Sequence, residues 1–117
     1  MFLFMKTIKA EEPQKLQRWQ QILLDGADAI ERDGWTRGRF YRKGAMCAVG
    51  GMAYGVTGRK NSILAFIVMC FNPSFREALS KLKQEIDHRS VIHWNDLYAN
   101  SRTITQTMRK AANNEHQ

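Results

Sequence analysis

Cysteine is scarce in this sequence, and neither of its two copies stands in a metal-binding pattern. Cys47 and Cys70 both lie among apolar residues, without a second Cys or a His at the spacing of zinc ligands. We therefore expect no metal site and no cofactor. Two reduced thiols that behave as small hydrophobic groups are the default in a reducing compartment, and a disulfide between them is the alternative.

Long hydrophobic runs and linkers are also absent. The longest apolar run, from Ile63 to Phe71, has about half of the ~20 residues that cross a bilayer. The N-terminal MFLFMK is too short an apolar run for a signal peptide. No repeat or low-complexity tract divides the chain. These absences predict a cytoplasmic protein without a membrane partner that folds as one domain over residues 1–117.

Acidic residues are outnumbered by basic ones. Eleven Asp and Glu stand against 18 Lys and Arg, which gives a formal net charge of +7. Such a balance favours polyanionic partners through long-range attraction, so nucleic acid is one possible partner. A basic surface can also serve solubility alone.

Hydrophobic spacing predicts an all-α fold, a compact bundle of about five helices. Pro13 suits the first position of the first helix, and Gly34 suits the left-handed residue just past its end. Gly26 inside this helix suggests that another element crosses it closely. The expected helices cover residues 13–33, 45 to about 55 or 58, 63–71, 74–88, a short helix or turn at 90–97, and 103–112.

Several local features sharpen this prediction. We expect Ser62 to cap the helix 63–71, which is hydrophobic all round and therefore expected to be buried, with a strand as the alternative. Ser74 with Glu77 and Thr103 with Gln106 have the spacing of capping boxes. In the segment 90–97, Val91, Ile92 and Trp94 are expected to point inward. Residues 1–10 form a loosely assigned arm, and residues 113–117 should fray.

The stretch from Gly34 to Gly58 departs most from ordinary globular composition. Its first part interleaves aromatic rings with cations and has no helical stripe, so we expect it to be extended or irregular. Its second part, from Gly44, is rich in Gly and Ala, which lets another backbone or a ligand approach closely. We expect a buried small-residue helix that packs within the core or against a second copy in a homo-oligomer.

The basic and aromatic part predicts an anion-binding surface, since cations neutralise phosphates and rings stack on bases. Asn95 and Asp96 would read the polar edge of the same ligand, or would instead tie a turn through backbone N–H groups. Arg102 would grip a phosphate or carboxylate, or merely pair with Asp96. The candidate ligand-binding residues are Trp35, Arg37, Arg39, Tyr41, Arg42, Lys43, Trp94, Asn95, Asp96 and Arg102.

Cys47 near a helix start suggests a different chemistry. Exposed N–H groups and the helix dipole stabilise a thiolate there. His93 would act as a base, with Asp96 or Asn95 orienting it. The competing interpretation is that a cysteine among Ala, Val and Met is a core residue.

Four short elements occur in an order that resembles a small family of uncharacterised proteins known from actinobacteria and their phages. They are Gly34-Trp35, Cys47 opening a helix with Gly50 and Gly51, Trp94-Asn95-Asp96, and Arg102-Thr103. The resemblance implies an all-α fold and a phage or bacterial setting. It implies no activity.

Three functional hypotheses follow. The first is a small non-enzymatic binding protein, encoded by a phage or mobile element, that sequesters an anionic nucleotide-like ligand or blocks an acidic surface of a host protein. The second is a sequence-tolerant DNA- or RNA-binding protein, and the third is a cysteine-dependent enzyme. Salt separates the first two, because neutralising a phosphate backbone gives a steep dependence on ionic strength.

Overall fold

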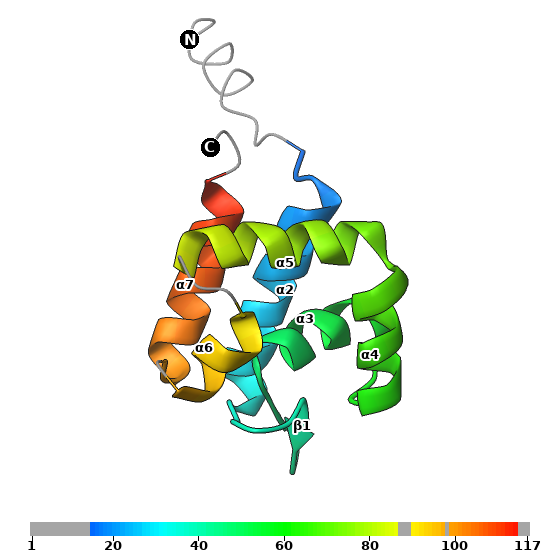
Figure 1. Ribbon diagram of the computed structural model, residues 1–117, viewed down its shortest axis with the longest axis vertical. Helices are drawn as coiled ribbons and strands as arrows, with labels where there is room; N and C mark the ends of the chain where they lie inside the picture. Colours follow the sequence, from blue (N-terminus) through cyan, green and yellow to red (C-terminus); the bar gives the residue numbers. More distant parts are fainter. Residues whose placement is uncertain (1–14, 87–89, 98, 115–117) are drawn as a thin grey trace, which may run out of the picture.

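The computed structural model describes residues 15–86, 90–97 and 99–114 (Figure 1). Its helices confirm the all-α prediction, with one small antiparallel hairpin added. Pro13, the arm at residues 1–10 and the tail at 115–117 lie outside the described residues. The elements are α2 (Arg18–Asp33), β1 (Tyr41–Arg42), β2 (Ala45–Met46), α3 (Ala48–Thr57), α4 (Ser62–Phe71), α5 (Pro73–Ile86), α6 (Val91–Leu97) and α7 (Ser101–Asn113).

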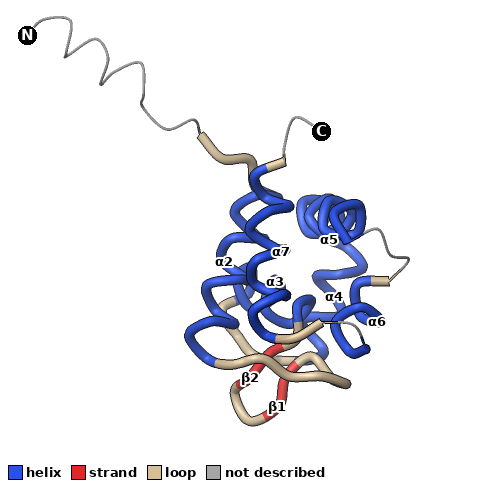
Figure 2. Tube along the Cα trace, turned by 90° about the vertical axis from the view of Figure 1, so that its left-hand side faces the viewer, coloured by secondary structure: helices blue, strands red, loops and turns tan. Residues whose placement is uncertain are grey.

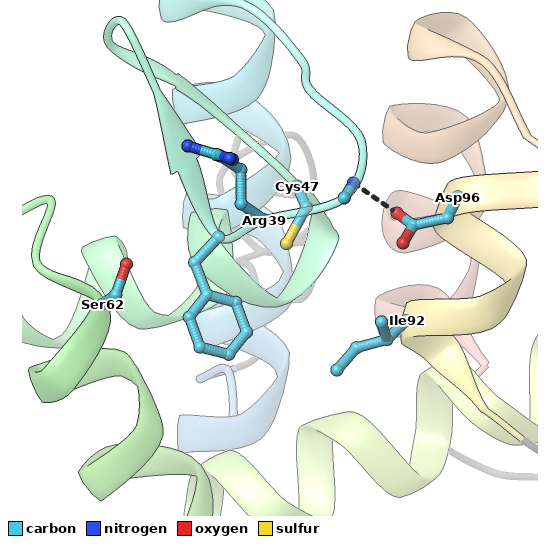
Figure 3. A pocket seen from close by; sticks show the side chains of 7 residues that line it. Arg39, Cys47, Ser62, Ile92 and Asp96 are labelled. Carbon is cyan, nitrogen blue, oxygen red and sulfur yellow. Dashed lines mark hydrogen bonds between the residues drawn. The ribbon is translucent and has the colours of Figure 1, made fainter.

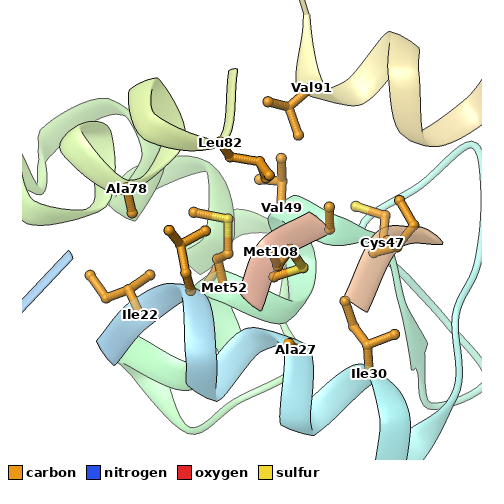
Figure 4. Packing of buried hydrophobic residues seen from close by; sticks show 14 of the residues in the cluster. Ile22, Ala27, Ile30, Cys47, Val49, Met52, Ala78, Leu82, Val91 and Met108 are labelled. Carbon is orange, nitrogen blue, oxygen red and sulfur yellow. The ribbon is translucent and has the colours of Figure 1, made fainter. Parts of the chain in front are cut away.

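Helix α2 lies at the centre of the fold. Its apolar face is buried against α3, α5 and α7, and the close view of the core shows Ile22, Ala27 and Ile30 on that face (Figure 4). It begins at Arg18. The prediction that the helix includes Lys15 to Gln17 is therefore wrong. Gly34 follows its end, as predicted, with a positive φ of 106°, but its ψ of 162° differs from the left-handed helical conformation expected there.

The close crossing predicted from Gly26 is present where α3 packs on α2. A Cβ atom at Gly26 would lie 3.0 Å from the backbone nitrogen of Met52, and one at Gly51 would lie 2.8 Å from the Ile30 side chain. Glycine is therefore needed on both helices. The small residues of α3 are used within this chain, so they no longer argue for packing against a second copy.

A hairpin replaces the predicted helix start at Ala45. Strand β1 pairs with β2, and the turn between them has positive φ at Lys43 (50°) and Gly44 (88°), as tight two-residue turns require. Met46 also exchanges hydrogen bonds with Gly34 and Thr36, so β2 is held on both sides. Helix α3 therefore begins only at Ala48.

Asparagine caps three helices for which the sequence predicted Ser or Thr. Asn61 accepts hydrogen bonds from the backbone N–H groups that open α4, Asn72 accepts from Phe75 N at 2.9 Å, and Asn100 accepts from Thr103 N at 2.9 Å. The predicted cap at Ser62 and the two predicted capping boxes are therefore wrong. An Asn side chain caps as well as Ser, and here it stands just before each helix.

Helix α4 is a helix as predicted, but the prediction of burial is wrong. Of its ten residues only Ala65 is buried, and Ile63 and Phe71 are 72% and 78% exposed. The helix packs against α3 and α5 on one side only. Ile92 on α6 is 42% exposed, contrary to the expectation that it is turned into the core, whereas Val91 and Trp94 are buried.

No single helix in the described ranges is long and apolar enough to cross a membrane. Helices α4 and α5 meet the length and composition test only together, and an 88° bend separates them.

Candidate functional site

The segment between α2 and α3 leaves the helical body as a loop and hairpin at one end of the fold, as Figure 2 shows. We call residues Arg37 to Lys43 the basic segment. The side chains of Arg37, Arg39, Arg42 and Lys43 are exposed. The expected irregular, cation-rich stretch is therefore present, and hydrogen bonds to the helices hold it in place.

Asn95 on α6 is the principal link between the helices and the segment. Its side chain is 1% exposed, and its Oδ1 accepts hydrogen bonds from Trp35 Nε1 (2.8 Å) and Ala48 N (3.0 Å). Its Nδ2 donates to Thr36 O (3.2 Å) and Asp96 Oδ1 (2.9 Å). An amide offers two donors and two acceptor sites, so this side chain is fully used. The geometry supports the interpretation that Asn95 ties a turn.

The aromatic groups predicted to stack on a ligand also make contacts within the chain. The Arg37 guanidinium lies 4.9 Å from the Trp35 ring centroid and donates to Ala99 O at 3.0 Å. The Tyr41 hydroxyl donates to Gly50 O at 2.9 Å, and burial raises the pKa of Tyr41 to about 12. Trp94 is buried. These rings hold the segment to the core.

A cavity of about 330 Å³ opens beside the basic segment (Figure 3). We call it the Cys47 pocket. Asp96 stands on its wall, where Oδ1 also accepts a hydrogen bond from Gly38 N at 3.0 Å. Arg39 supplies a cation, and most of the remaining wall is apolar. Its lining residues are Gly38, Arg39, Phe40, Cys47, Ser62, Ile92 and Asp96.

Cys47 is the residue that caps α3, and its Sγ accepts a hydrogen bond from Gly50 N at 3.3 Å. The residue is 4% exposed, and burial raises the pKa of its thiol to about 11. The structure brings Cys47 and Asp96 to one pocket, but His93 is exposed on α6 and is not among the lining residues. A protonated, buried thiol counts against the nucleophile hypothesis.

This burial predicts an alkaline weakness. Because the folded-state pKa lies above the ordinary value of 9.0, stability is present below pH 9 and is lost as the pH rises toward 11. We expect the wild type to lose about 2 kcal/mol more than Cys47→Ser by pH 10.5. Urea unfolding at pH 7.5, 9 and 10.5 measures the difference.

Alkylation gives the matching check at neutral pH. Folded protein treated with iodoacetamide at pH 7.5 should keep Cys47 unmodified, and unfolding in urea should expose it. Rapid modification of Cys47 in the folded protein would contradict a buried, protonated thiol.

Arg102 lies away from the Cys47 pocket. It is exposed on α7 at a surface hollow that Glu31 and Arg109 also line, and none of the ion pairs in the described ranges joins it to Asp96. The same ranges contain no cluster of His, Cys, Asp and Glu that could hold a metal ion. Of the predicted ligand residues, Arg39 and Asp96 line the Cys47 pocket, Arg102 lies at the other hollow, and Trp94 and Asn95 are buried.

Sequence reasoning missed Lys60, which fastens the hairpin. Its Nζ donates to Gly44 O at 2.7 Å, pairs with Asp33 at 3.0 Å and lies 5.4 Å from the Tyr54 ring centroid. Its position in a polar turn gave no signal of these contacts. It closes the hairpin against the ends of α2 and α3.

Comparison with known proteins places the chain in a family but gives no activity. No curated protein and no solved structure matches it. The model of a family of unknown function matches residues 15–114, nearly the whole chain, which confirms the expectation of an uncharacterised family. The chain belongs to the family of unknown function DUF6197.

Proposed function

We propose that this chain is a non-enzymatic binding protein that holds an acidic surface of a partner protein against its basic segment. The observation that carries the proposal is a set of exposed cations on a backbone that is fixed to the helices. Among the ion pairs of the described residues, none involves Arg37, Arg39, Arg42 or Lys43. Cations on an ordered backbone lose less conformational entropy on binding, and their field speeds encounter with an acidic partner.

The same geometry favours a protein over a nucleotide-like ligand. A nucleotide site needs a vacant ring face and an unused polar edge. The Arg37 guanidinium covers one face of Trp35, and the Tyr41 hydroxyl is bonded to Gly50 O. The amide of Asn95 is fully bonded, so these groups offer a nucleotide little. The first hypothesis offered two partners, an anionic nucleotide-like ligand or an acidic surface of a host protein. We therefore keep the acidic protein surface.

The biological setting is part of this proposal. The order of the Gly-Trp, Cys, Trp-Asn-Asp and Arg-Thr elements supports a protein encoded by a phage or mobile element. The partner would then be a cytoplasmic protein of the bacterial host.

Charge reversal tests the proposal. We expect Arg39→Glu, Arg42→Glu and Lys43→Glu together to reduce the capture of acidic proteins from a host lysate by roughly tenfold or more. Capture by immobilised protein followed by quantitative mass spectrometry measures the change. The matched control carries the same change at Lys15, Arg18 and Arg76, which are exposed on other surfaces, and should capture as the wild type does. Equal losses in both variants would show that only net charge matters and would refute the proposal.

Nucleic acid is the second candidate, because the same exposed cations suit a phosphate backbone. Titration with a labelled random oligonucleotide at ~50 mM and ~200 mM salt separates the two. Binding that falls by several orders of magnitude between these concentrations indicates backbone neutralisation. No binding at the lower salt concentration removes the nucleic-acid hypothesis.

A further inference from the structure

Helix α4 presents a stripe of large apolar side chains without cover from the described residues. Ile63, Phe66, Ile67 and Phe71 are all exposed, and the helix contains no charged residue. A Phe side chain has roughly 150–250 Å² to bury, so the stripe reaches the few hundred Å² at which exposed apolar patches mark interaction sites.

The flank of α4 beside this stripe, which carries Ser62 and Met69, borders two hollows that meet at Ile92. The first is the Cys47 pocket. The second has a volume of about 180 Å³ and lies among α3, α4, α5 and α6. Figure 1 shows α3 between α4 and α6, and α3 packs on both. The second hollow is lined by Val49, Met69, Leu79, Lys83, Ser90, Val91 and Ile92.

One side of α4 forms a wall common to both hollows. Ser62 lines the first and Met69 lines the second. Ser62, Phe66 and Met69 follow at steps of four and three residues, so they lie on one side of the helix. Phe66, 55% exposed, therefore stands between the hollows on the α4 side, as Ile92 does on the α6 side. We call this surface the α4–α6 trough.

The spacing of the hollows favours a helical occupant. The two lining residues of α4, Ser62 and Met69, are seven positions apart, which is about 10 Å along the helix axis. A partner helix lying alongside would place residues i and i+7 at that separation on one face. A β-strand repeats on one face at about 7 Å and 13 Å, so it fits less well.

Charge decides the character of the occupant. Arg39 stands at the first hollow and Lys83 at the second. Asp96 is the carboxylate on these walls, and its Oδ1 already accepts hydrogen bonds from Gly38 N and Asn95 Nδ2. Each hollow thus offers a cation to an acidic group, with the Asp96 carboxylate also present at the first hollow, whereas the surface between the hollows is apolar.

We propose that the α4–α6 trough receives an amphipathic α-helix of the partner protein, with apolar side chains seven residues apart and acidic residues near both ends. This inference rests on the proposed function and deepens it, because Arg39 belongs both to the basic segment and to the trough. The helix would bury its apolar face beside α4 while its acidic ends meet Arg39 and Lys83.

Selection from a displayed library of 15-residue helical peptides tests the inference on the full chain. We expect the enriched peptides to carry apolar residues at i and i+7 with acidic flanks. Ile92→Glu and Phe66→Glu should each lower the affinity for a synthetic enriched peptide by roughly tenfold or more, measured by fluorescence anisotropy. Phe71→Glu is the matched control. Phe71 belongs to the part of the stripe that faces away from the trough, half a turn round α4 from Ser62, so this variant should bind as the wild type does. Circular dichroism confirms that each variant is folded.

Other occupants give distinct results, and each would overturn the inference. A wild-type dimer in light scattering that Phe66→Glu converts to a monomer would show that a second copy fills the trough. Binding to anionic lipid vesicles that Phe66→Glu abolishes would show a membrane surface. Failure to enrich peptides, or enriched peptides that bind Ile92→Glu unchanged, would leave the trough without this role.

The outcome also separates this inference from the proposed function. If charge reversal of the basic segment abolishes partner capture and Ile92→Glu does not, the trough is refuted and the proposed function stands. If neither change affects capture, both are refuted.

Discussion

Replacing Asn95 by alanine is expected to lower the free energy of unfolding by about 4 kcal/mol. The side chain makes four hydrogen bonds from a buried position. Its loss leaves Ala48 N and Thr36 O without their partner, and an unsatisfied buried polar group costs about 1–3 kcal/mol. The Trp35 indole N–H also loses its acceptor. Urea unfolding monitored by circular dichroism measures the effect.

Asn100→Ala is the matched control for this experiment. Asn100 is exposed, and its side chain accepts one described hydrogen bond, from Thr103 N at the start of α7. Loss of a helix cap costs about 1 kcal/mol. If Asn95→Ala costs no more than Asn100→Ala, Asn95 does not link α6 to the basic segment in the way described.

Gly50→Ala should be the next most damaging single change, at about 3 kcal/mol or more. A Cβ atom there would overlap the carbonyl oxygen of Phe40. That oxygen accepts a hydrogen bond from Cys47 N, and Tyr41 bonds to the Gly50 carbonyl, so the hairpin and α3 cannot separate without losing both. Forced shifts in a packed core typically cost 1–3 kcal/mol or more. Because the hairpin carries Arg42 and Lys43, partner capture should fall too.

Gly58→Ala is the control for replacing a glycine without a steric clash. Gly58 has a φ of 72°, and a Cβ atom there would meet no other atom within 4 Å. Its replacement should cost on the order of 1 kcal/mol through conformation alone. Thermal unfolding of the two variants compares them, and equal losses would mean that Gly50 is not held against the Phe40 backbone.

Helices and their close crossing were predictable because local spacing encodes them. The stripe of α2, the end at Gly34 and the tight approach at Gly26 follow from side-chain period and size. The exposure of α4 was not predictable. Its residues show that it is apolar, but whether other elements are available to cover it depends on the whole arrangement.

The residue types of the candidate site were predictable from the sequence, but the contacts among these residues were not. The sequence places cations at Arg39 and Arg42, and they are exposed as expected. Trp35 and Asn95 are both predicted ligand contacts, yet their side chains form a hydrogen bond with each other, although they are sixty positions apart in the chain. Such long-range hydrogen bonds leave no periodic signal. Residue types alone do not show which polar groups the fold uses internally.

Native mass spectrometry of protein purified from host lysate, washed and treated with nuclease, tests the central claim most directly. Our account predicts an additional mass equal to an acidic polypeptide, lost on denaturation and absent from the Arg39→Glu, Arg42→Glu, Lys43→Glu variant. A surplus of a few hundred daltons would indicate a nucleotide-like ligand. That result, or a retained oligonucleotide, would contradict the account.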